Sequence, residues 1–157
     1  MIDWETRRRI EDFLLDCAWA IDENDLEAWP DFFAADGRYR ITTRDNEERG
    51  LPVGIMLCEG RGMMEDRVLA LRTANIFEPH RYRHILGRPR LREAEGRLVR
   101  SDSSFIVMRT MQDGRMDLFA AGNYRDLLRV EDGQVMFQER AAVLESRRVD
   151  VLIVIPI

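Results

Sequence analysis

The sequence predicts an α+β fold in which N-terminal helices pack into a strongly curved, mixed but mostly antiparallel sheet. Helix patterns come first in the chain, and long strand patterns separated by Glu-Gly and Asp-Gly turns follow them. A length of 157 residues with 45% hydrophobic content suits one domain, residues 1–157, with its own core. A helix held inside a bent sheet forms a cone with an interior pocket.

The first predicted helix begins after Asp3, which can cap it, and runs to about Asn24. Its apolar residues recur at steps of three and four, which places them on one face: Ile10, Phe13, Leu14, Cys17, Ala18 and Ile21. A stripe of this size must bury against a large apolar surface, and a curved sheet provides one.

A short second helix is predicted around Leu26–Phe33. Trp29 and Phe33 give it a heavy apolar face and are predicted core residues. Pro30 indicates that this helix begins late or is kinked.

The first strands follow this helix. Asp36-Gly37 indicates a turn into a strand at Arg38–Thr43, where Tyr39 and Ile41 alternate with arginines. Residues 44–50 form a predicted polar loop. Residues 53–59 form a short buried strand.

The segment after Gly60 combines a helix with a strand and holds both histidines, His80 and His84. Its helix has apolar residues at i, i+4 and i+7, namely Met64, Val68 and Leu71. Pro79 prevents further helix, and in the strand that follows Tyr82, His84 and Leu86 alternate with Arg81 and Arg83. The apolar phase shifts further along, and Gly87 is the predicted site of a bulge.

The remaining chain is predicted to be an antiparallel meander of three long strands. These strands are Ser103–Met111, Met116–Leu128 and Val135–Leu144. The turns predicted between and before them are Glu95-Gly96, Asp113-Gly114 and Asp132-Gly133.

The last nine residues, VDVLIVIPI, are apolar on both faces of an extended chain. Val151, Ile153 and Ile155 are therefore predicted to be buried between subunits, with burial as a core strand of the same subunit as the alternative.

Composition excludes several classes of partner. The net charge is −5, which argues against a general affinity for nucleic acid or anionic membrane. All 24 basic residues are arginine, since the sequence contains no lysine. Cys17 and Cys58 lack a CxxC spacing and are expected to be reduced core thiols, and no signal or membrane-spanning pattern occurs. The expected location is the cytoplasm.

A metal site in this chain has weak support. His80 and His84 would share a helix face, with Glu78 or Asp66 as a third ligand. Pro79 and the alternating pattern favour a strand instead, in which residues four apart lie about 13 Å from each other. We therefore expect no metal and no cofactor in this chain.

Acid–base chemistry in the cone pocket is a second possibility. The polar residues expected near the interior are Asp36, Tyr39, His84, Tyr124 and Arg140. The simpler interpretation is that buried tyrosine and histidine satisfy hydrogen bonds in the core or at an interface. Arg81 and Arg83 face away from the pocket and are expected to form salt bridges at a surface or subunit contact.

The order and spacing of motifs along nearly the whole chain resemble the small (β) subunits of aromatic-ring-hydroxylating dioxygenases. The version carried here is most similar to the terephthalate type, with anthranilate-, salicylate- and benzoate-type relatives as near alternatives. The motifs are Ala28-Trp29-Pro30-Asp31-Phe32-Phe33, Asp36, Tyr39-Arg40, Gly54-Ile55, Asp66-Arg67-Val68-x-Ala70-Leu71-Arg72, Ala74-Asn75-Ile76, His80-Arg81-Tyr82-Arg83-His84-Ile85-Leu86-Gly87, Gln138-Glu139-Arg140-x-Ala142-Val143 and Asp150-x-Leu152.

The resemblance implies the cone-shaped fold of the nuclear-transport-factor and scytalone-dehydratase group. It implies a structural β subunit, trimeric within an α3β3 hexamer. The large (α) subunit of that hexamer would carry a Rieske [2Fe-2S] cluster and a mononuclear Fe(II). The holoenzyme would convert an aromatic carboxylic acid to a cis-dihydrodiol with electrons from NAD(P)H. Arg81, Arg83 and His84 would then lie at subunit contacts.

Two other functions stay open from sequence. One is a stand-alone dehydratase or isomerase, with His84 and either Asp36 or Tyr39 as acid and base. The other is a small-ligand-binding module without chemistry. The fold alone does not decide among these, because it hosts all of them.

Overall fold

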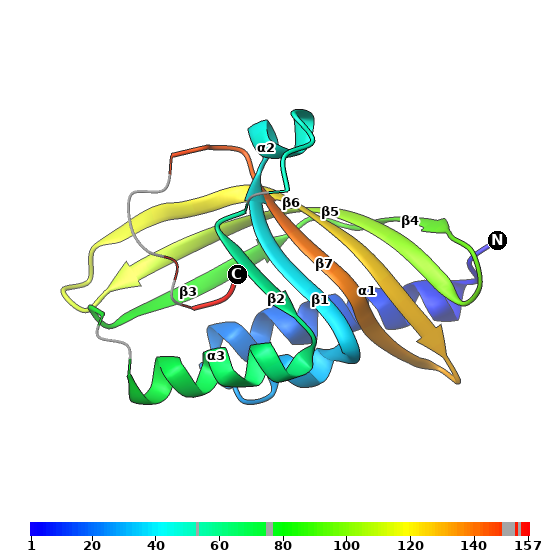
Figure 1. Ribbon diagram of the computed structural model, residues 1–157, viewed down its shortest axis with the longest axis horizontal. Coiled ribbons are helices and arrows are strands. Elements are labelled where there is room, and N and C mark those ends of the chain that lie inside the picture. Colours follow the sequence, from blue (N-terminus) through cyan, green and yellow to red (C-terminus); the bar gives the residue numbers. More distant parts are fainter. Residues whose placement is uncertain (53, 75–76, 149–152, 154) are drawn as a thin grey trace.

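The computed structural model describes residues 1–52, 54–74, 77–148, 153 and 155–157. Figure 1 shows one sheet that bends around α1, with α1 and α3 on the same side of it. The helical elements are α1 (Trp4–Asp22), the 3₁₀ helix η1 (Trp29–Phe32), α2 (Arg44–Glu48) and α3 (Arg61–Thr73). The strands are β1 (Phe33–Thr43), β2 (Met56–Glu59), β3 (His80–Leu86), β4 (Arg90–Glu93), β5 (Leu98–Met111), β6 (Met116–Glu131) and β7 (Gln134–Leu144).

Helix α1 forms as its stripe of apolar residues predicts. The Asp3 side chain accepts a hydrogen bond from the Thr6 backbone N–H, which caps the first turn. Ile10, Leu14 and Cys17 are buried on the face that meets the sheet. The helix ends at Asp22, two residues before the predicted end.

The second predicted helix is shorter than expected. Residues 29–32 form a single 3₁₀ segment, because Pro30 lies in its first turn and the strand begins at Phe33. Trp29 and Phe33 are buried, as predicted.

Asp36-Gly37 is an irregularity inside β1 and not a turn before it, which corrects the prediction. The register of β1 against β7 shifts between Phe33 and Arg38, so the chain bulges there and continues as strand. A Cβ on Gly37 would lie 2.8 Å from the carbonyl oxygen of Ala34, so this close approach requires glycine.

Residues 44–48 form the short helix α2, where the sequence predicted a polar loop. The Thr43 hydroxyl caps it by accepting a hydrogen bond from the Asn46 backbone N–H. A helix of five residues without buried side chains has no apolar period that a sequence pattern could reveal.

Gly87 lies where β3 ends and the chain steps to β4, as the predicted irregularity requires. From Leu86 to Arg90 the chain advances four residues, while the partner strand β5 goes from Phe105 to Asp102, three residues. The extra residue shifts the phase of the side chains between β3 and β4.

The sheet is mixed and mostly antiparallel, with strand order β2-β1-β7-β6-β5-β3 and β4 paired to the other end of β5. The parallel pair is β1 with β7, and β5, β6 and β7 form the predicted antiparallel meander. Register shifts after Val107 in β5 and after Leu127 in β6 add local bends. Both long helices pack against this sheet: α1 contacts β3, and α3 contacts β1 and β2.

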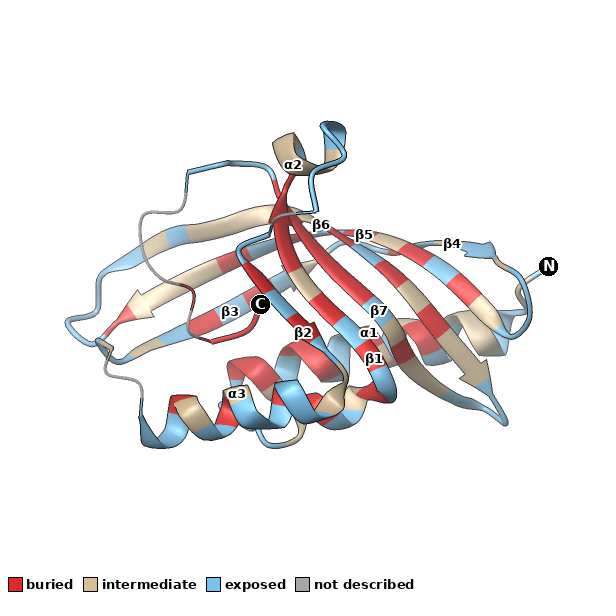
Figure 2. Cartoon of the chain, in the orientation of Figure 1, coloured by how far each residue is buried: buried red, intermediate tan, exposed pale blue. Residues whose placement is uncertain are grey.

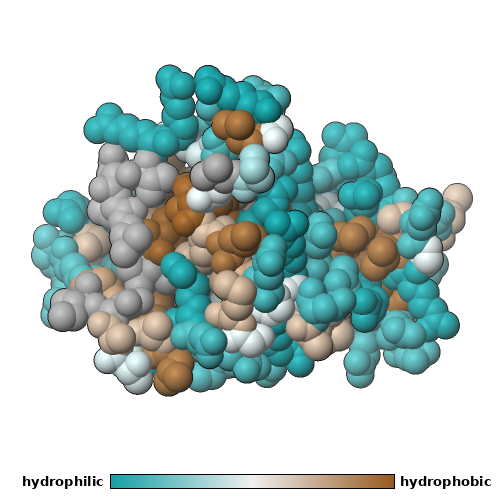
Figure 3. All heavy atoms as spheres, in the orientation of Figure 1, coloured by the Kyte–Doolittle hydropathy of each residue, from teal (hydrophilic) through white to brown (hydrophobic). Residues whose placement is uncertain are grey.

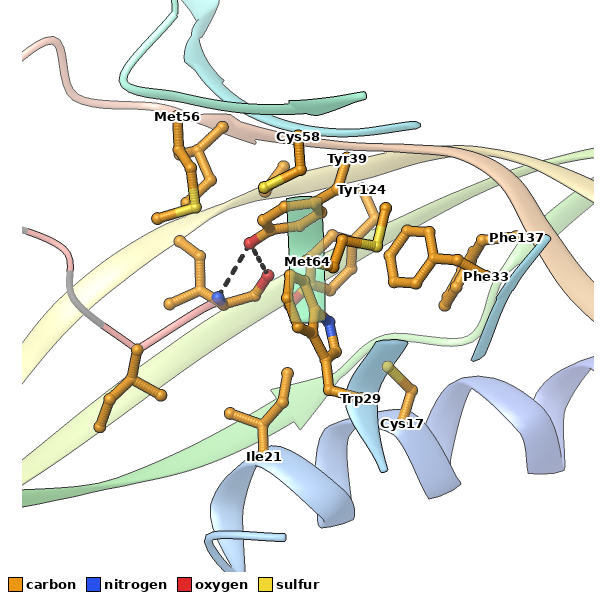
Figure 4. Close-up of a cluster of buried hydrophobic side chains, with 14 of the residues drawn as sticks. Cys17, Ile21, Trp29, Phe33, Tyr39, Met56, Cys58, Met64, Tyr124 and Phe137 are labelled. Atoms are coloured by element: carbon orange, nitrogen blue, oxygen red, sulfur yellow. Dashed lines mark hydrogen bonds between the residues drawn. The ribbon is translucent and has the colours of Figure 1, made fainter. Parts of the chain in front are cut away.

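The core lies between the helices and the inner face of the sheet (Figure 2). Figure 4 shows its aromatic centre, where Trp29, Tyr39 and Phe33 meet edge to face. The described part of the chain contains no helix long and apolar enough to cross a membrane.

Candidate functional site

Inside the cone, an aspartate from α1 contacts a histidine from β3. Asp22 Oδ1 lies 2.6 Å from His84 Nδ1, and Asp22 Oδ2 accepts the His84 backbone N–H at 2.8 Å. The two side chains are only 3% and 1% exposed. Because an ionised carboxylate only accepts hydrogen bonds, Nδ1 is the donor in its contact with Asp22.

This pair has the parts of an acid–base dyad, but Nε2 is enclosed. It is buried and has no hydrogen-bond partner among the described residues. A cavity of about 270 Å³ lies beside Asp22 and is lined also by Phe77, His80 and Tyr82, but His84 is not part of its lining. The pair is therefore placed to tie α1 to β3, and a substrate in this cavity would not meet Nε2.

The three residues proposed for acid–base catalysis do not come together. Asp36 has a side chain that is 75% exposed, and it accepts a hydrogen bond from Gln138 on the outside of the sheet. This corrects the expectation that Asp36 lies near the interior; the bulge at residues 36–37 turns it outward. His84 is in the interior, and its acidic partner is Asp22.

Tyr39 is buried, but its hydroxyl is already satisfied by the end of the chain. It donates to the Ile157 carbonyl oxygen at 2.7 Å and accepts from the Ile157 N–H at 3.0 Å (Figure 4). Burial raises the pKa of Tyr39 well above its usual value, so the phenol stays neutral. Tyr39 therefore anchors the C-terminal residue.

Tyr124 and Arg140 are buried, as predicted, and form a second polar cluster with Asp126. Arg140 donates through Nε and Nη2 to the two Asp126 carboxylate oxygens at 2.9 and 3.1 Å. The guanidinium stacks over the rings of Tyr124 and Phe137. Burial raises the pKa of Asp126 and Arg140 opposes this shift, and burial raises the pKa of Cys17 to about 12. The cluster is a satisfied core ion pair, and no reactive thiol is formed.

The two histidines do not share a metal site. His80 lies at the start of β3, and its Nδ1 is 2.8 Å from the carbonyl oxygen of Glu78. The described residues contain no group of three or more His, Cys, Asp or Glu that could hold a metal ion.

The outer side of β3 carries the predicted arginine contacts. Arg81 is exposed and Arg83 is half exposed. Arg83 pairs with Glu23 at 3.1 Å and lies 4.9 Å from the ring of Trp19, which is itself 56% exposed. His84 is turned the other way, and this placement corrects the expectation that its side chain takes part in a subunit contact directly.

The C-terminal isoleucines lie in the core of their own chain. Ile153, Ile155 and Ile157 are 2%, 8% and 0% exposed, and all belong to the main hydrophobic cluster. The assignment of Ile153 and Ile155 to a subunit interface is corrected accordingly, because their surface is already covered within the chain. Val151 lies outside the described residues. Figure 3 shows hydrophobic surface gathering around this C-terminal region on an otherwise mostly hydrophilic face.

Asp22 and Asp126 were not predicted as buried polar residues, although each lies on an otherwise apolar face of its helix or strand. Asp22 follows Ala18 by four residues and so falls on the apolar stripe of α1. Asp126 shares the two-residue alternation of Tyr124 and Leu128 on β6. A carboxylate on an otherwise apolar face implies a buried cationic or hydrogen-bonding partner.

The fold is the one that solved cone-shaped proteins share. A protein from Novosphingobium aromaticivorans assigned as a scytalone dehydratase superposes with a TM-score of 0.67 at 17% identity, over 88% of this chain and 83% of that one. The beta subunit assigned to an aromatic-ring-hydroxylating dioxygenase from the same organism superposes with a TM-score of 0.88 at 34% identity, over 96% of each chain. The fold class is therefore the predicted α+β cone of the scytalone-dehydratase group.

Sequence comparison identifies the family within this class. The model of the ring hydroxylating beta subunit family matches residues 17–151. A beta subunit of the terminal oxygenase component of terephthalate 1,2-dioxygenase from Comamonas sp is 41% identical over 89% of this chain and 91% of its own. The small subunit of anthranilate 1,2-dioxygenase from Burkholderia cepacia is 35% identical over 87% of this chain and 85% of its own. The chain belongs to the ring-hydroxylating dioxygenase beta-subunit family, and its relatives are components of oxidoreductase complexes.

Proposed function

We propose that this chain is the structural, non-catalytic β subunit of a dioxygenase that acts on an aromatic carboxylic acid of the terephthalate, anthranilate or benzoate type. Its partner would be a large subunit that carries a Rieske [2Fe-2S] cluster and a mononuclear Fe(II), in an α3β3 hexamer with a trimer of this chain. The 41% identity to a terephthalate 1,2-dioxygenase subunit supports the substrate class. Two buried, free cysteines support a reducing compartment, and we place the complex in the cytoplasm.

The observation that supports the structural role is that the candidate acid–base groups of the interior are already engaged within the chain. The candidate base, His84 Nε2, is buried. Both carboxylate oxygens of its partner, Asp22, accept hydrogen bonds from His84. Tyr39 is likewise engaged by Ile157. A dehydratase or isomerase needs its base within hydrogen-bond reach of a substrate, and this arrangement favours a scaffold instead.

The outer side of β3 supports a contact with another subunit. β3 is the last strand in the sheet order, so one edge of it has no strand partner in the described chain. Ile85 is 57% exposed on the same strand, between Arg83 and the end of β3, and Trp19 adds exposed aromatic surface. Arginine beside exposed aromatic and aliphatic side chains is the composition of interface cores. His84 contributes indirectly, because its bond to Asp22 holds β3 against α1.

Replacement of Arg83 by Ala tests this contact. Arg83 is half exposed and pairs with Glu23 at 3.1 Å and, more distantly, with Asp22 at 3.9 Å. Asp22 keeps both hydrogen bonds from His84 in the variant, so the free energy of unfolding should change by no more than about 1 kcal/mol. The fraction of hexamer formed with the co-expressed large subunit, measured by light scattering after size exclusion, should fall. Arg97→Ala is the control at another exposed arginine, because Arg97 makes an ion pair with Glu131 at the far end of the sheet. An unchanged hexamer in Arg83→Ala would remove Arg83 from the interface.

A further inference from the structure

The outer face of the sheet holds a charged groove that the fold itself does not explain. Its volume is about 510 Å³, and it crosses β4, β5, β6, β7 and β1. Apart from Leu127 and Ala141, its lining residues are polar or charged: Arg38, Arg40, Arg92, Arg100, Asp102, Asn123, Arg125, Asp126, Glu139 and Arg140. Asp126 and Arg140 direct their side chains to the core, so the other charges form the outer surface of the groove.

Strand register arranges these charges in rows. Arg92 lies opposite Arg100, Arg100 opposite Leu127, Leu127 opposite Glu139, and Glu139 opposite Arg38. Residues opposite one another on paired strands point to the same face, about 5 Å apart. One row therefore runs straight across five strands. It places two arginines next to each other at one end, and like charges at such positions repel.

Most charges of the groove are paired within the chain, but two at its centre are not. Arg92 pairs with Asp102, and Arg38 reaches Glu59 at 3.4 Å. Within the described ranges, neither Arg100 nor Glu139 makes an ion pair or a side-chain hydrogen bond. Both side chains are exposed, their backbones are about 10 Å apart with one strand between them, and no ion pair joins the two residues.

The unpaired cation and anion identify the kind of partner. Small-ligand pockets are mostly apolar, whereas this groove is lined by charges. A simple anion would satisfy Arg100 and be repelled by Glu139. A second copy of this chain presents both an arginine and a glutamate on the same face, so two copies complement each other.

We propose that this sheet face is a contact between copies of the chain, in which Arg100 of one copy pairs with Glu139 of the next. This inference deepens the trimer of the proposed function and rests on it. The repulsion between adjacent arginines is relieved when the neighbouring copy brings a carboxylate into the row. In a ring, each copy uses its arginine towards one neighbour and its glutamate towards the other.

Charge reversal with rescue tests the pairing on the full chain. Arg100→Glu and Glu139→Arg should each weaken self-association at least about tenfold, measured by light scattering and native mass spectrometry over a concentration series. The double variant R100E/E139R should return to within about threefold of the wild type, because the pair is restored with opposite polarity. Arg115→Glu and Glu65→Arg are matched reversals at exposed sites outside the groove and should leave self-association unchanged. Far-UV circular dichroism should show the wild-type secondary structure in all five, since each site is exposed on the single chain.

Several results would overturn the proposal. A wild-type chain that stays monomeric, single reversals without effect, or a double variant that stays as weak as the single ones would each do so. If Arg100→Glu keeps the homo-oligomer but no longer binds the co-expressed iron-containing large subunit, the groove serves that subunit. That result would overturn the copy-to-copy contact and leave the proposed function intact. Failure of the wild-type chain to bind any large subunit would overturn the proposed function itself.

Discussion

Replacing Asp22 by Ala tests the buried link between α1 and β3. The Asp22 carboxylate accepts two hydrogen bonds from His84, one from Nδ1 at 2.6 Å and one from the backbone N–H at 2.8 Å. Its side chain is 3% exposed, so water does not replace the lost acceptor without a local rearrangement. Hydrogen bonds to a charged group contribute about 1.5–3 kcal/mol each. Asp22 is also the last residue of α1, where a negative charge opposes the helix dipole by about 0.3–1 kcal/mol.

The net expectation for Asp22→Ala is a loss of about 3–5 kcal/mol in the free energy of unfolding, which is also the usual cost of breaking a buried pair. For a chain of this length the melting temperature should fall by about 6–20 °C. Asp22→Asn should lose only about 1–2 kcal/mol, because its amide still accepts the His84 N–H and can donate to Nδ1.

Chemical denaturation followed by circular dichroism measures these differences. Asp16→Ala is the matched control, because Asp16 is an exposed aspartate on the same helix and should change the free energy of unfolding by less than about 0.5 kcal/mol. If Asp22→Ala loses less than about 1 kcal/mol, or no more than Asp16→Ala, the Asp22–His84 link does not hold α1 to β3.

Three further predictions concern other buried groups. Asp126→Ala leaves Arg140 buried without its carboxylate and should cost about 3–5 kcal/mol in denaturant unfolding; a loss under about 1 kcal/mol would contradict a core ion pair. Burial raises the pKa of both Cys17 and Cys58. Ellman's reagent at pH 8 should therefore label neither thiol in the native protein and both thiols after unfolding. Rapid labelling of the native protein would count against their burial. Burial raises the pKa of Tyr39 above its usual value of about 10, and the other two tyrosines are raised likewise. Above about pH 10 the unfolded chain therefore binds fewer protons than the folded one, and stability should fall as pH rises. Tyrosinate absorbance at 295 nm should then appear together with the loss of circular dichroism, and a gradual rise before unfolding would refute the prediction.

The sequence predicts the helices and long strands well because their apolar periods are strong. The stripe of α1 and the alternation in β3 are local signals, and tertiary packing agrees with them. Asp36-Gly37 has the composition of a turn, but β1 pairs with β7, a strand far away in the sequence, on both sides of it, and this pairing keeps the chain extended. Such pairing is not visible in a local pattern.

The interior polar pairs were harder to predict than the fold. His84 was expected inside, but its partner lies 62 residues earlier, and the contact depends on how far α1 reaches along β3. Asp36 is predicted near the interior of the cone, but the bulge in β1 turns it to the outside. The C-terminal segment is apolar on both faces, which suits burial within the chain as well as burial between chains. Composition therefore could not decide between the two, and the structure buries its described isoleucines within the chain.

The interior polar side chains of this chain are largely engaged with one another. Inside the cone, Trp29 packs against Tyr39, and the Tyr39 hydroxyl donates a hydrogen bond to the carbonyl oxygen of the C-terminal residue, Ile157. The charged outer groove and the edge of β3 are the two surfaces that we propose for contacts with other subunits.

The most direct test of this account is to tag the chain in its native host, purify it gently, and record the native mass and visible spectrum of what accompanies it. We expect a brown complex near the size of two trimers, with Rieske-type absorption and a larger second chain in equal amount. A colourless chain that purifies alone in repeated preparations would contradict the account and direct attention back to His84 and the interior of the cone.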